Sequence, residues 1–468
     1  MKKIIALVLF SAFLFSAAFC QQNENQQASA FLANGVPVYY KQNTTNAIDV
    51  VRVNISGGIF YYSPELAGIE NATLSMCLKG SKTMNYQTLQ QFCYQTSSSF
   101  GNGSGDLNGH LRIVSISKNL SDSIKVLADC FLNPGFDKGE YEKMMTEYLQ
   151  SIQATLNDPM SLLTYQLQNI INAGHVSQTS VAVTPESIEN ITLENIKAFH
   201  KTLLDSRRLS IFAYTSMPLD QLVEELNQNL GTVKAQTSPL KTGEITPVTV
   251  NFPPLVLTHP SAANAGYVLR TYAAPSIKDK DYWAFQLANA IYSKIMFNVI
   301  RTKHGVCYTP QAGDFGELAN VGVELLYSCT NYEDCVAAMA EARNLMTQGK
   351  FITGIKSNGD YKFSTIEKQL AAFKYSAINS IYGSQQTSAS VVNRMAAGLF
   401  YYNDISAFSR QEDWIMSVTA KDIQRVFAKY VLAEQDFWAA AVGPGEEMRL
   451  PFYKNEEFEK MPGETISQ

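Results

Sequence analysis

The sequence predicts an α+β fold made of two similar halves, because one pattern occurs twice at a spacing near half the chain. Residues 192–199 and 419–426 each begin with threonine, carry an acidic residue in the first helical turn and continue with an apolar stripe. A strand is expected after each helix, over 208–214 and 437–442. The offset of 227 residues (419 − 192) indicates two similar domains rather than a solenoid. A chain of 468 residues, 46% hydrophobic, can bury more than one core.

The expected domain boundaries follow from composition. A stretch rich in Thr, Ser, Lys, Pro and Gly predicts a linker at 232–249. It separates an N-terminal domain over 28–231 from a C-terminal domain over 250–460.

Residues 1–20 have the pattern of a secretory signal peptide. Lys2 and Lys3 precede an apolar run that ends at Phe15, and small residues follow it. The run is too short to span a membrane, and no later stretch is long and apolar enough to do so. We therefore expect an exported protein, in the periplasm or at the cell surface. Cys20 offers an alternative as a lipidated cysteine, but Phe19 before it fits that signal poorly.

Charge and cysteine content narrow the range of partners. The formal net charge is −5, and the chain without Lys2 and Lys3 has 35 basic against 42 acidic residues, which gives −7. This balance argues against nucleic acid or an anionic membrane surface as the main partner.

Cys329 and Cys335 are close enough in sequence to pair in an oxidising compartment. The absence of any C-x-x-C pair disfavours a zinc ribbon or a thiol-redox motif.

The elements of the first half are expected in the following order. Asn34-Gly35 marks a hairpin turn, and the glycine-rich run 101–109 reads as a flexible turn because it fits neither a phosphate loop nor a calcium loop. Two strands are expected within 31–40, one on each side of the hairpin turn, and further strands over 46–57 and 110–117. Helices are expected over 68–80, 86–96, 121–131 and 138–156. Gly80 is expected to be the C-cap of the first helix and Ser121 the N-terminal cap of the third. His110 is expected to be a strand residue with an ordinary hydrogen bond.

The second half is expected to begin with a strand over 266–273 and a helix over 281–299. The histidines outside these motifs are isolated from one another and from acidic clusters. Each is expected to be a surface or locally hydrogen-bonded residue rather than a metal ligand; they are His175, His200, His259 and His304.

The helix over 68–80 resembles the zinc-binding helix of the insulinase/pitrilysin peptidase family, in which G-x-x-H-x-x-E-H precedes apolar residues and Lys-Gly. When the two are aligned on Lys79-Gly80, the histidine positions fall on Asn71 and Ser75, and the position of the glutamate base falls on Leu74. Amide and hydroxyl groups are poor zinc ligands, and leucine cannot accept a proton from water. A shift of one residue brings in Glu70 but no imidazole.

The resemblance also places the family's third zinc ligand on the long helix over 138–156, at Ser151. A further acidic position of that helix falls on Met144. All positions that would hold the metal or the base are therefore substituted, and the resemblance implies that this chain needs no zinc or other cofactor.

A second family element is retained. The segment from Arg301 through Gly305 to Tyr308 is similar to the family's R-x-x-x-G-x-x-Y, which holds substrate across the cavity in active relatives. Arginine offers planar, charged donors to a peptide carbonyl, and a tyrosine hydroxyl can stabilise developing negative charge on oxygen. The alternative is a surface arginine beside a strand-end tyrosine packed on the core.

The resemblance implies two homologous halves, each a mostly antiparallel sheet with helices packed on it, facing each other across a cavity. It implies a non-catalytic chain that pairs with a zinc-bearing subunit of the same family and helps to bind a peptide substrate. The alternatives are a stand-alone peptide-binding or structural protein without a proteolytic role and, less favoured, an active peptidase with unconventional ligands.

Overall fold

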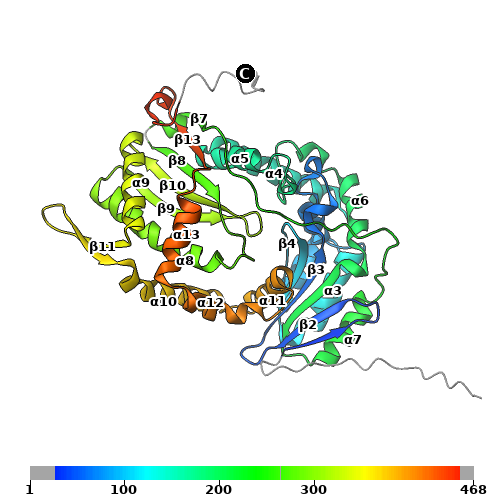
Figure 1. Ribbon diagram of the computed structural model, residues 1–468. Coiled ribbons are helices and arrows are strands. Elements are labelled where there is room, and N and C mark those ends of the chain that lie inside the picture. Colours follow the sequence, from blue (N-terminus) through cyan, green and yellow to red (C-terminus); the bar gives the residue numbers. More distant parts are fainter. Residues whose placement is uncertain (1–26, 264, 454–468) are drawn as a thin grey trace, which may run out of the picture.

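The computed structural model describes residues 27–263 and 265–453. The predicted signal peptide at 1–20 and Cys20 lie outside these residues. Figure 1 shows two bodies of sheet and helix, with the first half in blue to green and the second in green to red. Within the described residues, none of the helices has the length and apolar character needed to cross a membrane.

The sheet of the first half has the strand order β1-β2-β6-β3-β5-β4 within the described chain. Only the β2–β6 pair is parallel; the other pairs are antiparallel. The strands are β1 (Gln27–Phe31), β2 (Pro37–Gln42), β3 (Ile48–Ser56), β4 (Ser99–Ser104), β5 (Asn108–Ile116) and β6 (Leu209–Thr215).

The second sheet repeats this arrangement in the order β7-β13-β8-β10-β9, again with one parallel pair, β7–β13. This confirms the predicted fold class of two similar, mostly antiparallel halves. A separate hairpin, β11–β12, projects from the second half at the far left of Figure 1. The strands are β7 (Leu255–Thr258), β8 (Gly266–Ala273), β9 (Cys307–Phe315), β10 (Val321–Cys329), β11 (Lys350–Ile355), β12 (Tyr361–Thr365) and β13 (Phe437–Val442).

Helices follow the strands in a corresponding order in the two halves. Between α7 and β7, residues 231–254 form neither helix nor strand, and the expected linker falls within this stretch. The helices are α1 (Ile69–Cys77), α2 (Tyr86–Thr96), α3 (Leu120–Leu132), α4 (Lys138–Asn157), α5 (Pro159–Asn172), α6 (Leu193–Leu203), α7 (Leu219–Leu230), α8 (Tyr282–Met296), α9 (Tyr332–Thr347), α10 (Ile366–Ser384), α11 (Ser388–Tyr402), α12 (Gln411–Ser417) and α13 (Ala420–Val426).

The two halves exchange one helix each. Leu163 and Leu167 of α5 are buried against the second sheet, in one cluster with Phe437 of β13. Conversely, Met395 of α11 is buried against the first sheet with Phe212 of β6, and Figure 1 shows α11, in orange, beside β3. Burial of these apolar faces joins the two halves into one body, because each sheet has one face that is covered by a helix from the other half.

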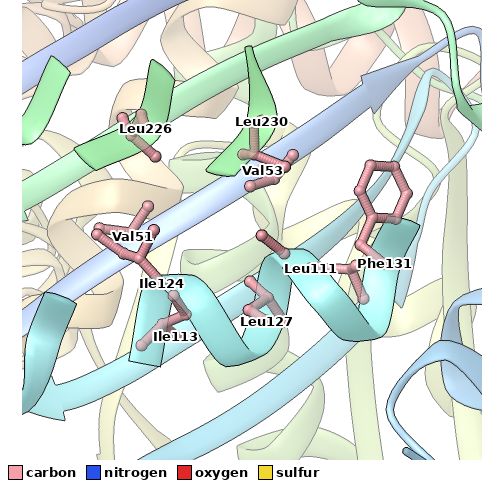
Figure 2. Close-up of a pocket in the computed structure, with 10 residues that line it drawn as sticks. Val51, Val53, Leu111, Ile113, Ile124, Leu127, Phe131, Leu226 and Leu230 are labelled. Carbon is pink, nitrogen blue, oxygen red and sulfur yellow. The ribbon is translucent and has the colours of Figure 1, made fainter. Parts of the chain in front are cut away.

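The core of the first half lies between its sheet and the helices α3 and α7. Figure 2 shows aliphatic side chains of β3 and β5, including Val51 and Leu111, facing Leu127 of α3 and Leu226 of α7. The cavity they enclose measures about 10 Å³, which is about the space of one water molecule. Because its lining is wholly apolar, it offers a water no hydrogen bond, and it is a packing gap rather than a ligand site.

Four local expectations are corrected by the structure. Helix α1 ends at Cys77, and Gly80 instead takes a φ of +105° in a turn, where it bridges Asn85. Helix α3 begins after Asn119 rather than with a Ser121 cap. Much of the glycine-rich run, expected to be a flexible turn, belongs to strand β4, because hydrogen bonds to β5 order it despite its glycine content. Cys329 and Cys335, which are close enough in sequence to pair, are both free thiols, and both are buried.

Candidate functional site

Helix α1 is held in the core of the first half by its apolar face and by a glycine at its start. Gly68 has a φ of +82°, and a Cβ there would lie 2.4 Å from the backbone nitrogen of Val183, so no other residue fits without displacement. Leu74 is fully buried in the main core cluster. The position that would carry a general base is therefore an ordinary core position in this chain.

Asn71 and Ser75 face Asn102 of strand β4. The Asn102 amide nitrogen donates to Asn71 Oδ1 and to Ser75 Oγ, both at 3.0 Å. Tyr148 of α4 also hydrogen-bonds the Ser75 side chain, which lowers the Tyr148 pKa against the larger raising effect of burial. We call these four side chains the Asn102 cluster. Neutral hydrogen bonds among protein groups link α1, β4 and α4 at the place that the resemblance assigns to zinc.

The Asn102 cluster does not fit a catalytic zinc ion. Such an ion takes imidazole, thiolate or carboxylate ligands, and the cluster offers only amide and hydroxyl groups. The Asn102 NH₂ group points its hydrogens at the two oxygens that would have to face a cation. Within residues 27–263 and 265–453, no group of three or more His, Cys, Asp or Glu side chains is arranged to hold a metal.

The structure does not bring all of the aligned positions together. Ser151 is exposed on α4, one turn beyond Tyr148, and Met144 is buried in the core of the first half. Neither belongs to the Asn102 cluster. The alignment with the family motif did not point to Asn102 or Tyr148, because the spacing of that motif says nothing about which residues of other elements face the helix.

A buried ion pair lies next to the cluster in sequence, at the residue before Asn71. Glu70, fully buried in the first turn of α1, faces Arg208, with Oε1 and Nη2 separated by 3.7 Å. Arg208 is held by Ser56 and Thr202 carbonyl oxygens and stacks on Tyr61, whose ring centroid lies 3.4 Å from its Cζ. Neither Glu70 oxygen has a hydrogen-bond partner within standard geometry. Burial raises the Glu70 pKa to about 7, although Arg208 opposes this shift.

Arg301 and Tyr308 lie together in the second half, where the π-helical segment η8 (Phe297–Lys303) leads into β9. Arg301 belongs to η8, and Tyr308 to the start of β9. The Arg301 Cζ lies 4.3 Å from the centroid of the Tyr308 ring. Gly305, with a φ of +67°, makes the turn that brings them together. Tyr308 is 63% exposed, and among the described residues no hydrogen bond joins the pair to the Asn102 cluster.

Two cavities lie between the halves. One, of about 660 Å³, is bounded by Glu65 and Asp106 of the first half, by Tyr165 of α5 and by Phe315 of β9. The other, of about 400 Å³, is lined by strands β3 to β5, by the turn between β9 and β10 and by α11. Asp106 lines both, so the cavities meet at the β4–β5 turn. Their size and mixed lining suit a short peptide segment or a small ligand.

The remaining histidines do not form a metal site. His200 is buried and hydrogen-bonds the Phe131 carbonyl oxygen at 2.7 Å, which fits the expectation of a local hydrogen bond. His304 lies 2.8 Å from a Glu341 oxygen at the surface. His110 lies on β5 as expected, but its imidazole makes no hydrogen bond with any described residue, which corrects that part of the expectation.

Comparison with known proteins supports the fold and the inactive character. Residues 190–351 match the family described as "Peptidase M16 inactive domain". A "Non-peptidase homolog YmxG" from Helicobacter pylori is 21% identical over 232 residues, which cover 49% of this chain and 52% of that protein. The matched stretch thus spans about half the length of that curated relative.

Solved structures of low sequence identity share the fold across most of the chain. A peptidase M16 inactive domain from Pseudomonas fluorescens is 16% identical, with a TM-score of 0.75, over 89% of this chain and 98% of that one. The periplasmic protease PqqL from Escherichia coli is 14% identical, with a TM-score of 0.73, over 94% of this chain and 49% of that one. This chain therefore corresponds to about half of PqqL.

Proposed function

We propose that this chain is a non-catalytic subunit that binds peptide beside a zinc-bearing M16 partner. It shares its fold with M16 proteins, and its residues 190–351 match the peptidase M16 inactive domain. The partner supplies the metal and the base. This chain supplies one wall of the substrate cavity together with Arg301 and Tyr308. Because such a pairing uses the retained arginine and tyrosine, it explains why these residues remain while the metal positions do not.

The observation that carries this proposal is the Asn102 cluster. A site that had merely lost one ligand would leave unpaired polar groups, whereas here one amide satisfies both Asn71 and Ser75. Both oxygens lie in half-buried residues and are paired within the protein, so this position needs no metal to satisfy its polar groups. The chain therefore folds without zinc, and its contribution to proteolysis comes from elsewhere.

Arg301 and Tyr308 are suited to act on a substrate held by a second chain. The pair is stacked and partly exposed, and no carboxylate among the described residues forms an ion pair with Arg301. Stacking on Tyr308 and Phe297 restricts the guanidinium, so less side-chain freedom is lost when it meets a carbonyl oxygen. The Tyr308 hydroxyl is available to donate to oxygen that gains charge during cleavage.

The test uses the two-chain enzyme isolated with its zinc-bearing partner. Tyr308→Phe should lower turnover by about 10²–10³-fold, the usual loss on removing one oxyanion donor, with assembly and zinc content unchanged. Arg301→Ala should also weaken peptide binding. Tyr375→Phe is the matched control, because Tyr375 is also 63% exposed but lies on α10. If both site variants assemble and cleave at the wild-type rate, Arg301 and Tyr308 have only a structural role.

The second candidate is a stand-alone peptide-binding or structural protein. It is favoured by the cavities between the halves, which are formed within one chain and need no partner. Recovery of the protein from its native cells without an M16 chain that has an intact H-x-x-E-H motif would favour it.

We also propose that the protein is exported through its N-terminal leader, to the periplasm or the cell surface. The pattern of Lys2-Lys3, an apolar run and small residues supports this. N-terminal sequencing of the protein from fractionated cells tests it: a start near residue 19 or 21 is expected, and a retained Met1 in the cytoplasmic fraction would contradict it. A lipid on Cys20 would show as added mass.

A further inference from the structure

Arg52 lines the cavity of about 400 Å³ between the halves, and Arg112 stands opposite it in the sheet; within the described residues neither has a carboxylate partner. Arg52 of β3 and Arg112 of β5 are direct partners in the register of these antiparallel strands, on the sheet face that looks toward α11. Like charges in directly opposed positions of a sheet destabilise it. Among the described residues, neither arginine forms an ion pair, although the chain has more acidic than basic residues.

All hydrogen bonds of Arg52 go to neutral amide oxygens. Its Nε donates to Asn54 at 2.6 Å, its Nη1 to Asn393 of α11 at 2.7 Å and its Nη2 to Asn108 at 3.4 Å. These bonds fix the guanidinium at the cavity wall and tie it to both halves of the molecule. They do not neutralise its charge.

Arg112 has even fewer contacts. Its Nε is buried without a hydrogen-bond partner, and the guanidinium forms no hydrogen bond, ion pair or aromatic contact with any described residue. Arg112 Nη2 lies beside Gly101 of the edge strand β4; a Cβ there would be in ordinary van der Waals contact at 3.6 Å, and the glycine leaves this space unfilled. A buried polar group left unpaired costs free energy, which a ligand that pairs with it can recover.

The electrostatics of the neighbourhood are those of an anion site. Burial, followed by Arg112, lowers the pKa of Arg52 to about 10, with no carboxylate raising it, so Arg52 is charged at neutral pH. Burial and the two arginines lower the pKa of His110 to about 3, so its imidazole is neutral. Asp106 and Glu317 also line the cavity, but Asp106 interacts with Glu317 and His175 rather than with the arginines.

We propose that Arg52 and Arg112 bind a carboxylate of a peptide that lies in the cavity between the halves. The inference rests on the proposed peptide binding and adds the class of residue that is preferred. Two guanidinium groups suit a carboxylate because each can donate parallel hydrogen bonds to its oxygens. An acidic side chain and a free C-terminus carry the same group, so both are sources to be distinguished.

The experiment measures binding of fluorescent, extended Ala/Thr peptides to the full chain. One peptide has a central Glu and an amidated C-terminus, the second has Gln in place of Glu, and the third has Gln with a free C-terminal carboxylate. Because charge-assisted hydrogen bonds are strong, we expect a carboxylate peptide to bind with a Kd that is lower by roughly tenfold or more than that of the amidated Gln peptide. Arg112→Gln should abolish this ratio. Lys125→Gln is the control, since Lys125 is exposed on α3, which covers the opposite face of the sheet.

Each outcome decides a separate point. A preference for the Glu peptide indicates an acidic side chain as the source, and a preference for the free C-terminus indicates the terminal carboxylate. Equal binding of all three peptides overturns the anion site and leaves the proposed peptide binding in place, whereas no binding by any peptide overturns both. Because Arg112 has no partner to lose, Arg112→Gln should unfold at the wild-type temperature or above it; a clear loss of stability would show a structural role.

Discussion

Replacing Asn102 with alanine tests whether the Asn102 cluster holds α1 in place. The substitution removes two hydrogen bonds of 3.0 Å and leaves Asn71 Oδ1 and Ser75 Oγ without this donor, both in half-buried residues. A typical hydrogen bond contributes about 0.5–1.5 kcal/mol, so a loss of about 1–3 kcal/mol in the free energy of unfolding is expected.

The assay is urea unfolding followed by circular dichroism, with Asn358→Ala as the matched control. Asn358 is exposed in the turn of the projecting β11–β12 hairpin, where its amide bonds only Asp360. The control should unfold within about 0.5 kcal/mol of the wild type, as surface substitutions do. An Asn102→Ala variant as stable as the control would show that the cluster does not stabilise the helix, and the physical basis for zinc-independent folding would be lost.

Two further predictions concern buried charges. Glu70 has a pKa of about 7 in the folded chain against 4.5 as its ordinary value, so between these pH values the folded state holds a proton that the unfolded state has released. Stability should therefore fall by about 3 kcal/mol as pH rises from 4.5 to 7, and Glu70→Gln should flatten this slope in thermal unfolding; an unchanged slope would contradict the assignment. Glu324, fully buried, accepts from Arg343 at 2.6 and 2.8 Å and from Arg270 at 3.0 Å. Glu324→Gln should cost about 3–5 kcal/mol in urea unfolding because it leaves Arg343 without its counterion and Arg270 with Asp436 alone, and a loss below about 1 kcal/mol would contradict this.

The sequence predicted the two halves because its signals were local and repeated. Thr192 and Thr419 do cap their helices, with side chains that accept from the backbone of Asn195 and Asp422. Strands β6 and β13 follow at the expected places. By contrast, no sequence expectation covered α5 and α11, and the sheet that each one covers depends on contacts between the halves.

The candidate site was predicted only in part, for two physical reasons. Composition made the run around Asn102 look like a flexible turn, whereas pairing with β5 orders it as an edge strand next to α1. The family spacing placed the third ligand position at Ser151, but the helix phase of α4 turns Tyr148 toward Ser75 and leaves Ser151 exposed. The sequence also could not predict that Arg112 lacks a partner, because this depends on which residue faces Arg112 across the sheet.

The most direct measurement of the proposed role is isolation of the tagged protein from its native cells, followed by mass spectrometry and metal analysis. We expect a second chain in equal amount that has an intact H-x-x-E-H motif, with one zinc per pair and chelator-sensitive peptide cleavage. The separated chain described here should carry no stoichiometric zinc and cleave nothing. A chain recovered alone that holds one zinc and cleaves peptides would contradict both the zinc-free site and the subunit role.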